Sequence, residues 1–424
     1  MKVFFDTIGC RLNQAEIERY AAQFTAMGHE IVPDAESADL VVVNTCSVTA
    51  AAASDSRGKV RSAAKSGAQV VVTGCWSTME PEAAAAMDGV IRVVPNAEKD
   101  TLTAQLLGVA PEIFDTEPLK RIILPGIHAR TRAFIKIQAG CDNHCTFCVT
   151  HLVRGKARSV SKERVLRDVT AALRSDGKEI VLTGVNLGAW GLDLEPAEEL
   201  ADLITFLLKE TDIPRIRLSS LESWNLSDRF LYLWEDPRMC PHFHLPLQSG
   251  SNSVLKRMAR RTTPAEFRRL AETAIRVNPD FAITTDVIAG FPGETDREFA
   301  ETVEFIESLR FSGGHVFPYS PRPGTAAARM KDPVPKPVQR ERAKILRDLF
   351  EIKTERFEES FIGSEQSVLW ESSRRLEDGR WESHGLTGNY LPVKCVFPDP
   401  VRNRIDKVRL LSRQEGVLLG EPVL

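Results

Sequence analysis

The strongest chemical signal is a cluster of three cysteines within eight residues, Cys141-Asp-Asn-His-Cys145-Thr-Phe-Cys148. Three thiolates on one short loop can converge on one soft metal centre. A 4Fe–4S cube held by three ligands keeps one iron open for a reactive ligand, as catalytic zinc sites keep an open position. A structural zinc site is the alternative, and His144 or His151 would offer its fourth ligand.

Three further cysteines, Cys10, Cys46 and Cys75, each follow a short apolar run. If these runs are parallel strands, the loops after them emerge at the same edge of the sheet. We therefore expect the three cysteines to meet in one crevice, where the N-terminal N–H groups of the following helices favour thiolates. The alternative is three separate buried thiols, which are common in protein cores.

The elements that position the second set lie in residues 1–120, where apolar runs alternate with helical patterns. Strands are predicted at Lys2–Asp6, Leu40–Asn44 and Gln69–Thr73. Helices are predicted at Ala15–Met27, Ala50–Ser66 and Pro81–Met87. This alternation implies a parallel sheet with right-handed crossovers. The stretch Pro111–His128, which contains several Pro and Gly, is expected to be a linker.

The loop with Cys141, Cys145 and Cys148 lies in residues 128–361, where the alternation of apolar runs and helical patterns continues. Strands are predicted at Phe134–Gln138, Glu179–Leu182, Arg215–Leu218, His242–Leu247, Ala282–Ile288 and Gly314–Phe317. Helical patterns fill most gaps, and a long charged helix at Pro337–Phe361 follows. Six βα units are fewer than the eight of a full barrel. A partial, open (β/α)6 barrel is therefore predicted.

From residue 362 the pattern becomes β, with short strands at Ser367–Glu371, Tyr390–Phe397, Lys407–Ser412 and Gly416–Leu419. A terminal module of this kind suggests a small barrel. The predicted fold class is α/β, in three domains. They are an N-terminal doubly wound parallel sheet (1–120), a partial barrel (128–361) and a small C-terminal β-barrel (362–424).

The composition restricts the class of protein. The 424 residues hold 55 Lys and Arg against 58 Asp and Glu, which argues against a protein that coats nucleic acid nonspecifically. No apolar run approaches the roughly 18 residues that cross a bilayer, and the start is too short for a secretion signal. We expect a cytoplasmic protein without a membrane partner, whose cysteines are metal ligands or nucleophiles. Cys240 and Cys395 lack ligand spacing and are expected to be structural.

The Cys141 loop, with Phe147 before its last cysteine, resembles the radical S-adenosylmethionine superfamily when placed on a six-strand βα series. The resemblance implies that Cys141, Cys145 and Cys148 hold a 4Fe–4S cluster whose open iron binds S-adenosyl-L-methionine. Reduction would give a 5′-deoxyadenosyl radical, with electrons from a donor protein such as a flavodoxin or ferredoxin. The protein then supplies positioning rather than the radical chemistry itself.

The motifs around the other cysteines narrow the resemblance to the methylthiotransferases, over essentially the whole chain. Gly9-Cys10, Asn44-Thr45-Cys46 and Gly74-Cys75 stand at successive strand ends before the barrel. The resemblance implies that Cys10, Cys46 and Cys75 bind a second 4Fe–4S cluster that carries the sulfur. The C-terminal module resembles the RNA-binding TRAM domain, on Gly363, Val368–Glu371 and Gly385–Tyr390.

Three branches of that family modify different targets. They act on N-threonylcarbamoyladenosine of tRNA, on isopentenyladenosine of tRNA, or on an aspartate of a ribosomal small-subunit protein. Asn44–Thr49, Thr183–Gly191, Arg217–Glu222 and His315–Ser320 resemble the first branch. The segment Trp76-Ser77-Thr78 departs from it, since Tyr or Ala followed by Gln is expected there.

Loops after the predicted barrel strands supply candidate cofactor contacts. Gly184 and Asn186 lie in a glycine-containing loop, where backbone can approach a ligand closely. The resemblance implies that this loop contacts the amino group of S-adenosylmethionine. It also implies that Glu222, Gln248 and Ser249 lie near S-adenosylmethionine or the target base. A plain turn is the alternative for the Gly184 loop. The segment Gly290–Thr295 fits either a direct cofactor contact or a tight turn before a helix.

Basic residues gather at Lys256–Arg261 and Arg402–Arg413, and at Arg154, Lys156 and Arg158. Each group alone fits a solvated face, but together they suggest a focused anionic partner. A hairpin loop would suit these charges, because unstacked loop bases can enter a pocket. The resemblance implies that this partner is the anticodon stem-loop of tRNA.

The leading hypothesis is a transferase that adds a methylthio group to carbon 2 of N-threonylcarbamoyladenosine next to the anticodon. That carbon–hydrogen bond is unactivated, so a radical is required. The alternatives are the other two family targets, and a noncatalytic iron–sulfur or zinc protein that binds RNA.

Overall fold

The computed structural model describes residues 1–115, 118–125, 131–224 and 226–423. The chain divides into two compact units. The first comprises Met1–Asp212 and Ser320–Ala328, and the second comprises Ile213–Tyr319 and Arg329–Leu424. Both cysteine sets belong to the first unit. The predicted domain boundaries at 120, 128 and 361 stay a prediction.

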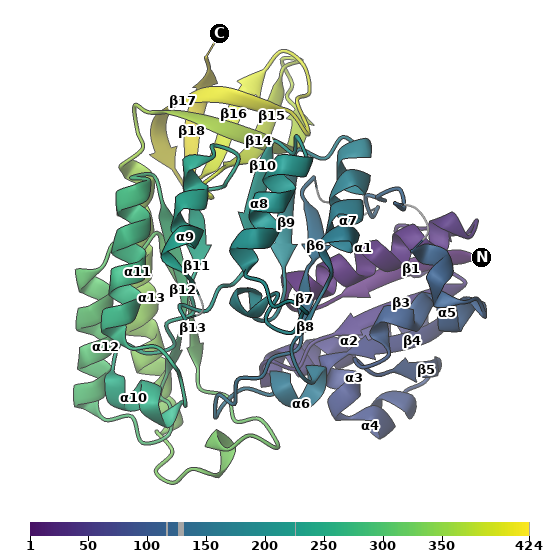
Figure 1. Cartoon of the computed structure of the whole chain (residues 1–424), viewed down its shortest axis with the longest axis horizontal. Helices are drawn as coiled ribbons and strands as arrows, with labels where there is room; N and C mark the ends of the chain where they lie inside the picture. Colours follow the sequence, from purple (N-terminus) through teal and green to yellow (C-terminus); the bar gives the residue numbers. More distant parts are fainter. Residues whose placement is uncertain (116–117, 126–130, 225, 424) are drawn as a thin grey trace. The chain divides into compact units, whose positions relative to one another are not determined.

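The N-terminal sheet of the first unit is parallel, with the order β2-β1-β3-β4-β5 (Figure 1). Its strands are β1 (Lys2–Thr7), β2 (Glu30–Ile31), β3 (Leu40–Thr45), β4 (Gln69–Gly74) and β5 (Val90–Val94). This order is that of a doubly wound fold, which confirms the predicted class. The Val-rich β3 is buried along its whole length. Two strands were not predicted from the sequence: β2, which is two residues long, and the half-exposed edge strand β5.

Helices cover both faces of this sheet. They are α1 (Arg11–Ala26), α2 (Ala50–Lys65), α3 (Cys75–Met79), α4 (Pro81–Ala85) and α5 (Leu102–Leu107), with 3-10 turns η1 (Lys99–Thr101) and η2 (Pro111–Phe114). One core joins Phe5 to Phe24 of α1, and the other joins Val41 to Val60 of α2. The predicted linker 111–128 begins with η2, and its residues 116–117 and 126–128 lie outside the described residues.

The rest of the first unit begins the βα series. Its elements are β6 (Ala133–Lys136), β7 (Gln138–Ala139), α6 (Thr150–Arg154), β8 (Arg158–Ser159), α7 (Lys162–Arg174), β9 (Glu179–Thr183), η4 (Leu187–Ala189) and α8 (Leu200–Glu210). Strands β6 and β9 pair in parallel. The predicted strand Phe134–Gln138 is split, because β7 leaves β6 to pair with β8 in an antiparallel manner. That pairing closes the loop that carries Cys141, Cys145 and Cys148.

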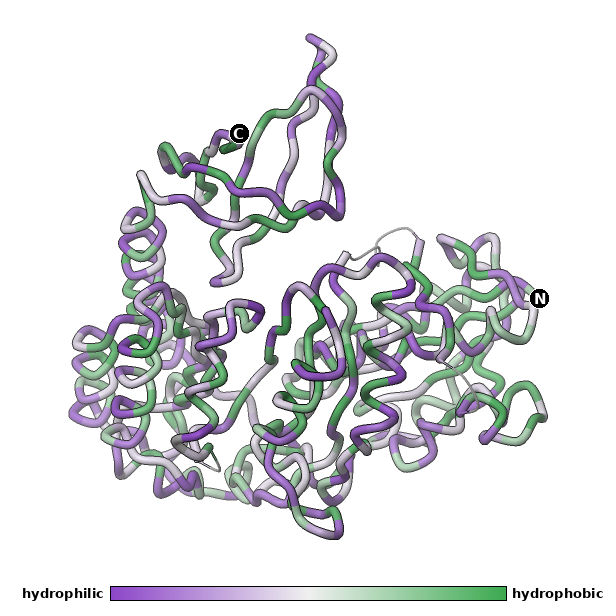
Figure 2. The backbone as a smooth tube through the Cα atoms, turned by 45° about the horizontal axis from the view of Figure 1, so that its top comes forward, coloured by the Kyte–Doolittle hydropathy of each residue, from purple (hydrophilic) through white to green (hydrophobic). Residues whose placement is uncertain are grey.

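The second unit continues the series with a parallel sheet, β11-β12-β13. Its elements are β10 (Arg215–Leu218), α9 (Asp228–Leu231), η5 (Tyr232–Glu235), β11 (His242–His244), α10 (Asn252–Arg257), α11 (Pro264–Val277), β12 (Ala282–Ala289), α12 (Asp296–Ser308), β13 (Gly313–Pro318) and α13 (Lys336–Glu359); η6 (Ala327–Arg329) precedes α13. Hydrophobic and hydrophilic residues both occur along the helices (Figure 2). Helix α11 buries Phe267, Ala271 and Ala274.

The chain ends in a closed barrel of order β14-β15-β16-β18-β17, also in the second unit. Its strands are β14 (Glu365–Arg375), β15 (Trp381–Thr387), β16 (Pro392–Phe397), β17 (Ile405–Gln414) and β18 (Val417–Pro422). The barrel interior includes Trp370, Val393 and Leu410. The predicted small C-terminal β-barrel is therefore confirmed. Strand β15 was missed because Trp-Glu-Ser-His-Gly-Leu-Thr holds Gly, His and Glu in place of an apolar alternation.

No helix in the described part of the chain is both long enough and apolar enough to cross a bilayer.

Candidate functional site

The three N-terminal cysteines stand at the carboxyl edge of the parallel sheet. Cys10 lies just before α1, Cys46 just after β3, and Cys75 begins α3. Two glycines permit close approach of their loops. A Cβ on Gly9 would lie 2.7 Å from Sγ of Cys46, and a Cβ on Gly74 would lie 2.3 Å from the Thr45 carbonyl oxygen. The structure therefore brings these loops together, as was predicted from the position of the three cysteines after parallel strands.

The electrostatics of this edge show the same convergence. Burial, together with the neighbouring thiols of Cys10 and Cys75, raises the pKa of Cys46 to about 11. Cys46 and Cys75 are buried, whereas Cys10 is exposed. In the ligand-free protein, Cys46 is thus a neutral thiol, and its thiolate would require a bound cation to replace the proton.

A buried polar network lies beneath the cysteines. Lys99 Nζ contacts Glu16 Oε2 at 2.5 Å and donates to Asn44 Oδ1 at 2.8 Å. Arg154 donates to Glu16 Oε1 at 3.2 Å and to Asn13 Oδ1 at 2.6 Å. Although burial opposes ionisation, Lys99 and Arg154 hold the pKa of Glu16 far below its ordinary value. The network is therefore charged, with two cations on one carboxylate.

The other three cysteines, Cys141, Cys145 and Cys148, lie on a loop whose ends are clamped. The Cys141 amide donates to the Gly155 carbonyl at 3.0 Å, and the Ala157 amide donates to Asp142 Oδ1 at 3.2 Å. A Cβ on Gly140 would lie 1.8 Å from the Lys156 carbonyl oxygen, so glycine permits this closure. Cys145 is buried, and Cys141, Phe147 and Cys148 are half-buried.

Helix α6 joins the two cysteine sets. At its start, the Thr150 amide donates to Cys148 Sγ at 3.4 Å. At its end, Arg154 enters the polar network, and Asn96 Nδ2 donates to the Val153 carbonyl at 3.0 Å while lying 3.7 Å from Cys75 Sγ. The helix has five residues, which at 1.5 Å per residue span about 7 Å. Both sets therefore border one short helix.

Gln138, which the sequence analysis did not single out, holds the predicted cofactor loop. Its Oε1 accepts from the amides of Val185 and Asn186, both at 2.9 Å. Its Nε2 donates to the carbonyls of Ala139 and Gly140 at 3.0 and 2.9 Å. A Cβ on Gly184 would lie 3.0 Å from Oε1 of this side chain. A Gln that directly precedes a cysteine loop was the signal available in the sequence.

The other predicted cofactor contacts belong to the second unit. Glu222 follows β10, and Arg260 Nη1 and Nη2 donate to its two carboxylate oxygens at 2.9 and 2.5 Å. Gln248 has a φ of +68°. Ser249 is fully buried, and its hydroxyl lies 3.1 Å from Thr302 Oγ1. The carboxylate of Glu222 and the hydroxyl of Ser249 thus already have protein partners.

The alternatives for the cysteines can be compared with this geometry. None of the eight cysteines, all within the described residues, forms a disulfide. Among the residues that the structure describes, no group of three or more His, Cys, Asp or Glu side chains is arranged to hold a metal ion. His144 and His151 contact each other edge to face, with ring centroids 5.0 Å apart.

Several of the basic residues considered for RNA are engaged within the protein. Arg154 is only 6% exposed, so its assignment to an RNA-binding surface is wrong. Arg257 pairs with Glu298 at 2.8 Å, and Arg409 and Arg413 pair with carboxylates of their own unit. Lys156 and Arg158 are exposed. The charge that remains open to a partner is therefore smaller than the sequence suggested.

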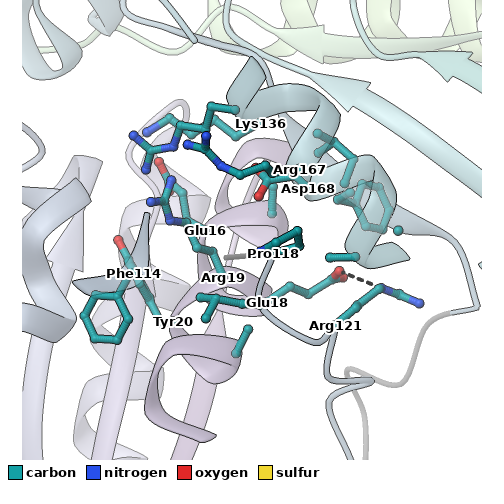
Figure 3. Close-up of a pocket in the computed structure, with 18 of the residues that line it drawn as sticks. Glu16, Glu18, Arg19, Tyr20, Phe114, Pro118, Arg121, Lys136, Arg167 and Asp168 are labelled. Carbon is teal, nitrogen blue, oxygen red and sulfur yellow. Dashed lines mark ion pairs between the residues drawn. The ribbon is translucent and has the colours of Figure 1, made fainter. Parts of the chain in front are cut away.

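A separate pocket in the first unit lies beside α1 (Figure 3). Charges of both signs line it, including Glu18, Arg121, Lys136 and Asp168. Glu18 and Arg121 form an ion pair across 3.5 Å, and burial raises the pKa of Asp168 to about 6. Among the described residues that line it, none is a predicted site residue.

The sequence matches two family models in chain order. An uncharacterized protein family, UPF0004, matches residues 2–95, and the radical SAM superfamily matches residues 135–306. These matches cover the N-terminal cysteine sheet and the βα series with its cysteine loop.

Curated relatives and a solved structure agree with this order. The threonylcarbamoyladenosine tRNA methylthiotransferase MtaB of Thermotoga maritima is 36% identical over 382 residues, 87% of this chain and 86% of the relative. The tRNA-2-methylthio-N(6)-dimethylallyladenosine synthase of Wolbachia pipientis is 30% identical over 441 residues, 99% of both chains. The radical S-adenosylmethionine methyltransferase TsrM of Kitasatospora setae shares the fold, with a TM-score of 0.57 at 14% identity over 77% of both chains. The chain therefore belongs to the radical S-adenosylmethionine methylthiotransferase family.

Proposed function

We propose that this enzyme adds a methylthio group to carbon 2 of N-threonylcarbamoyladenosine next to the anticodon of tRNA. The observation that carries the proposal is helix α6, which borders both cysteine sets within one compact unit. A sulfur carrier and a radical source have to act on the same atom of the substrate, and α6 keeps the two sets within one short helix of each other. Membership of the family sets aside the noncatalytic alternative.

The enzyme uses S-adenosylmethionine and 4Fe–4S clusters, and its cysteines supply the thiolate sulfur that such clusters take as ligands. We propose Cys141, Cys145 and Cys148 for one cluster and the N-terminal three for the second. Beside the latter, the buried polar atoms Ser47 Oγ and Asn96 Oδ1 have no partner among the described residues. When bound, these groups supply the radical and the sulfur that convert an unactivated carbon–hydrogen bond.

The chain's own residues would hold S-adenosylmethionine by the loop after β9. Asn186 Oδ1 and Thr183 Oγ1 are buried and without a partner in the part of the chain that the structure describes. They are acceptors suited to an amino group, which is the role proposed for this loop with Gly184. Gln138 fixes the loop through the amides of Val185 and Asn186, so it positions these acceptors.

The substrate class follows from the relatives and the architecture. The relatives named above act on tRNA, and the one named for threonylcarbamoyladenosine is 36% identical against 30% for the dimethylallyladenosine synthase. We infer that the C-terminal barrel, a TRAM-like module, binds the anticodon stem-loop. We also propose a cytoplasmic location and an electron donor such as a flavodoxin or ferredoxin.

The proposal is tested with purified, cluster-reconstituted variants and tRNA that carries N-threonylcarbamoyladenosine without the methylthio group. We expect Cys141→Ala, Cys145→Ala and Cys148→Ala to abolish 5′-deoxyadenosine formation. We expect Cys10→Ala, Cys46→Ala and Cys75→Ala to keep that cleavage but to lose the methylthio product. Cys395→Ala is the matched control, because Cys395 is a buried cysteine of the C-terminal barrel.

Three results would contradict the proposal. Methylthiolated nucleoside from the N-terminal variants would remove the sulfur-carrier role. Product from tRNA with isopentenyladenosine, but none from tRNA with N-threonylcarbamoyladenosine, would move the enzyme to the other tRNA branch. Product on neither tRNA, with cleavage intact, would favour the ribosomal aspartate.

A further inference from the structure

The buried network beneath the N-terminal cysteines carries more positive than negative charge. Lys99 and Arg154 both contact the carboxylate of Glu16, and Asn13 and Asn44 complete their hydrogen bonds. All five side chains are at most 6% exposed. Taken together, these groups leave one net positive charge inside the protein.

An excess buried charge is costly unless an anion balances it. The balancing groups lie at the cysteine edge. Asn96 Nδ2 lies 3.7 Å from Cys75 Sγ and donates at 3.0 Å to the carbonyl of Val153, the residue before Arg154. Cys10 Sγ also lies 3.8 Å from Asn13 Oδ1, the atom that Arg154 contacts. The guanidinium is therefore within electrostatic reach of two of the three N-terminal cysteines.

The origin of this cation in the chain matters as much as its charge. Arg154 ends α6, six residues after Cys148, yet its partners Asn13 and Glu16 are 141 and 138 residues away in the sequence. The segment that follows the Cys141–Cys148 loop thus places a fixed positive charge beside Cys10, Cys46 and Cys75.

We propose that Arg154 is a positioning residue that stabilises negative charge on the cluster bound by Cys10, Cys46 and Cys75, and so makes that cluster easier to reduce. A 4Fe–4S cluster on three thiolates is an anion, and reduction adds a further negative charge. Net charge around the cluster and burial are among the features that set its reduction potential. This inference rests on the proposed function, which places a cluster at these cysteines.

A purely structural role for Arg154 makes a different prediction. Its planar guanidinium bridges Glu16 and Asn13, and a lysine ammonium cannot reproduce that fork. A structural role therefore predicts that Lys and Met are equally harmful at this position. The electrostatic role predicts that Lys, which keeps the charge, preserves the reduction potential even where it lowers thermal stability.

The experiment compares the full-length, reconstituted wild type with Arg154→Met and Arg154→Lys. Electron paramagnetic resonance at fixed applied potentials reports the reduced fraction of each cluster, and addition of S-adenosylmethionine identifies the signal of the Cys141 cluster by its change. Thermal unfolding of the cluster-free proteins measures stability separately. Arg61→Met, an exposed arginine on α2 of the same unit, is the matched control. Arg154→Gln replaces Arg154→Met if the Met variant does not fold.

We expect Arg154→Met to lower the ratio of reduced to oxidised N-terminal cluster about tenfold or more at a fixed potential, because a charge near a buried anion acts through a low effective dielectric. Arg154→Lys and Arg61→Met should stay within about threefold of the wild type. Equal ratios in Arg154→Met and the wild type, or equal losses in Met and Lys, would overturn the inference. If the only cluster signal of the wild type is the one that changes on addition of S-adenosylmethionine, the protein has no second cluster, and that part of the proposed function is overturned instead.

Discussion

Replacing Gln138 tests whether one buried amide positions the cofactor loop relative to the cysteine loop. Gln138 is fully buried and makes four hydrogen bonds, two accepted from the loop after β9 and two donated to the backbone before Cys141. Gln138→Ala removes all four. It leaves the amides of Val185 and Asn186 without this partner, beside the candidate contacts to S-adenosylmethionine.

The magnitude follows from the hydrogen bonds. Each is worth about 1 kcal/mol net, and a buried amide left without a partner costs about 1–3 kcal/mol. Water that enters the space left by the side chain will recover part of this, so we expect the free energy of unfolding to fall by about 2–4 kcal/mol. We expect the Kd for S-adenosylmethionine to rise about 10- to 100-fold, since the loop must be ordered again on binding.

Gln138→Glu separates the two halves of the interaction. A carboxylate still accepts from Val185 and Asn186, but it cannot donate to the carbonyls of Ala139 and Gly140 and is repelled by them. We therefore expect it to weaken closure of the cysteine loop, seen as a lower iron content after reconstitution.

Equilibrium dialysis of S-adenosylmethionine and thermal unfolding measure these effects. Gln105→Ala is the control, because the Gln105 amide donates to Glu98 and Thr101 within a local turn far along the chain from the cysteines. Gln138→Ala with an unchanged Kd and an unchanged unfolding temperature would refute the reasoning.

Three further predictions concern other contacts. Gly140→Ala should lower iron content at least severalfold, because its Cβ would meet the Lys156 carbonyl. The control is Gly108→Ala, since Gly108 has a φ of +67° but lies in open space. This control should lose only about 1 kcal/mol of unfolding free energy and should keep its iron. Arg217→Met should destabilise the C-terminal barrel by about 2–4 kcal/mol and expose it to limited proteolysis, since buried Arg217 donates to two barrel carbonyls and lies over the Tyr390 ring at 3.8 Å. Asp168, whose pKa is about 6 when folded against 3.8 ordinarily, should cost stability as the pH rises through this interval, so Asp168→Asn should raise the unfolding temperature at pH 8 but not at pH 4.

The parts of the fold that depend on a local sequence pattern could be predicted from the sequence. Strands such as β3 and β4 are buried on both faces, so their Val runs were recognisable. Their carboxyl ends then placed Cys46 and Cys75 at one edge, as the topology of parallel sheets requires. Edge strands such as β5, and β15 with its polar residues, lack this signal because solvent or a barrel neighbour accepts their side chains.

The contacts that join the two cysteine sets could not be predicted in this way. Arg154 follows a cysteine loop and looks like a surface cation in the sequence, but it pairs with a carboxylate 138 residues earlier. Such a pairing depends on how separate sheets pack, which no local pattern encodes. The same holds for Gln138, whose partners in the Gly184 loop are 47 and 48 residues away.

The central claim is tested most directly by mass spectrometry of tRNA nucleosides from cells with the gene, without it, and with the gene restored. The account predicts that 2-methylthio-N-threonylcarbamoyladenosine disappears without the gene, that N-threonylcarbamoyladenosine accumulates, and that restoring the wild type, but not Cys46→Ala, reverses both changes. An unchanged amount of the methylthiolated nucleoside in cells that lack the gene would contradict it.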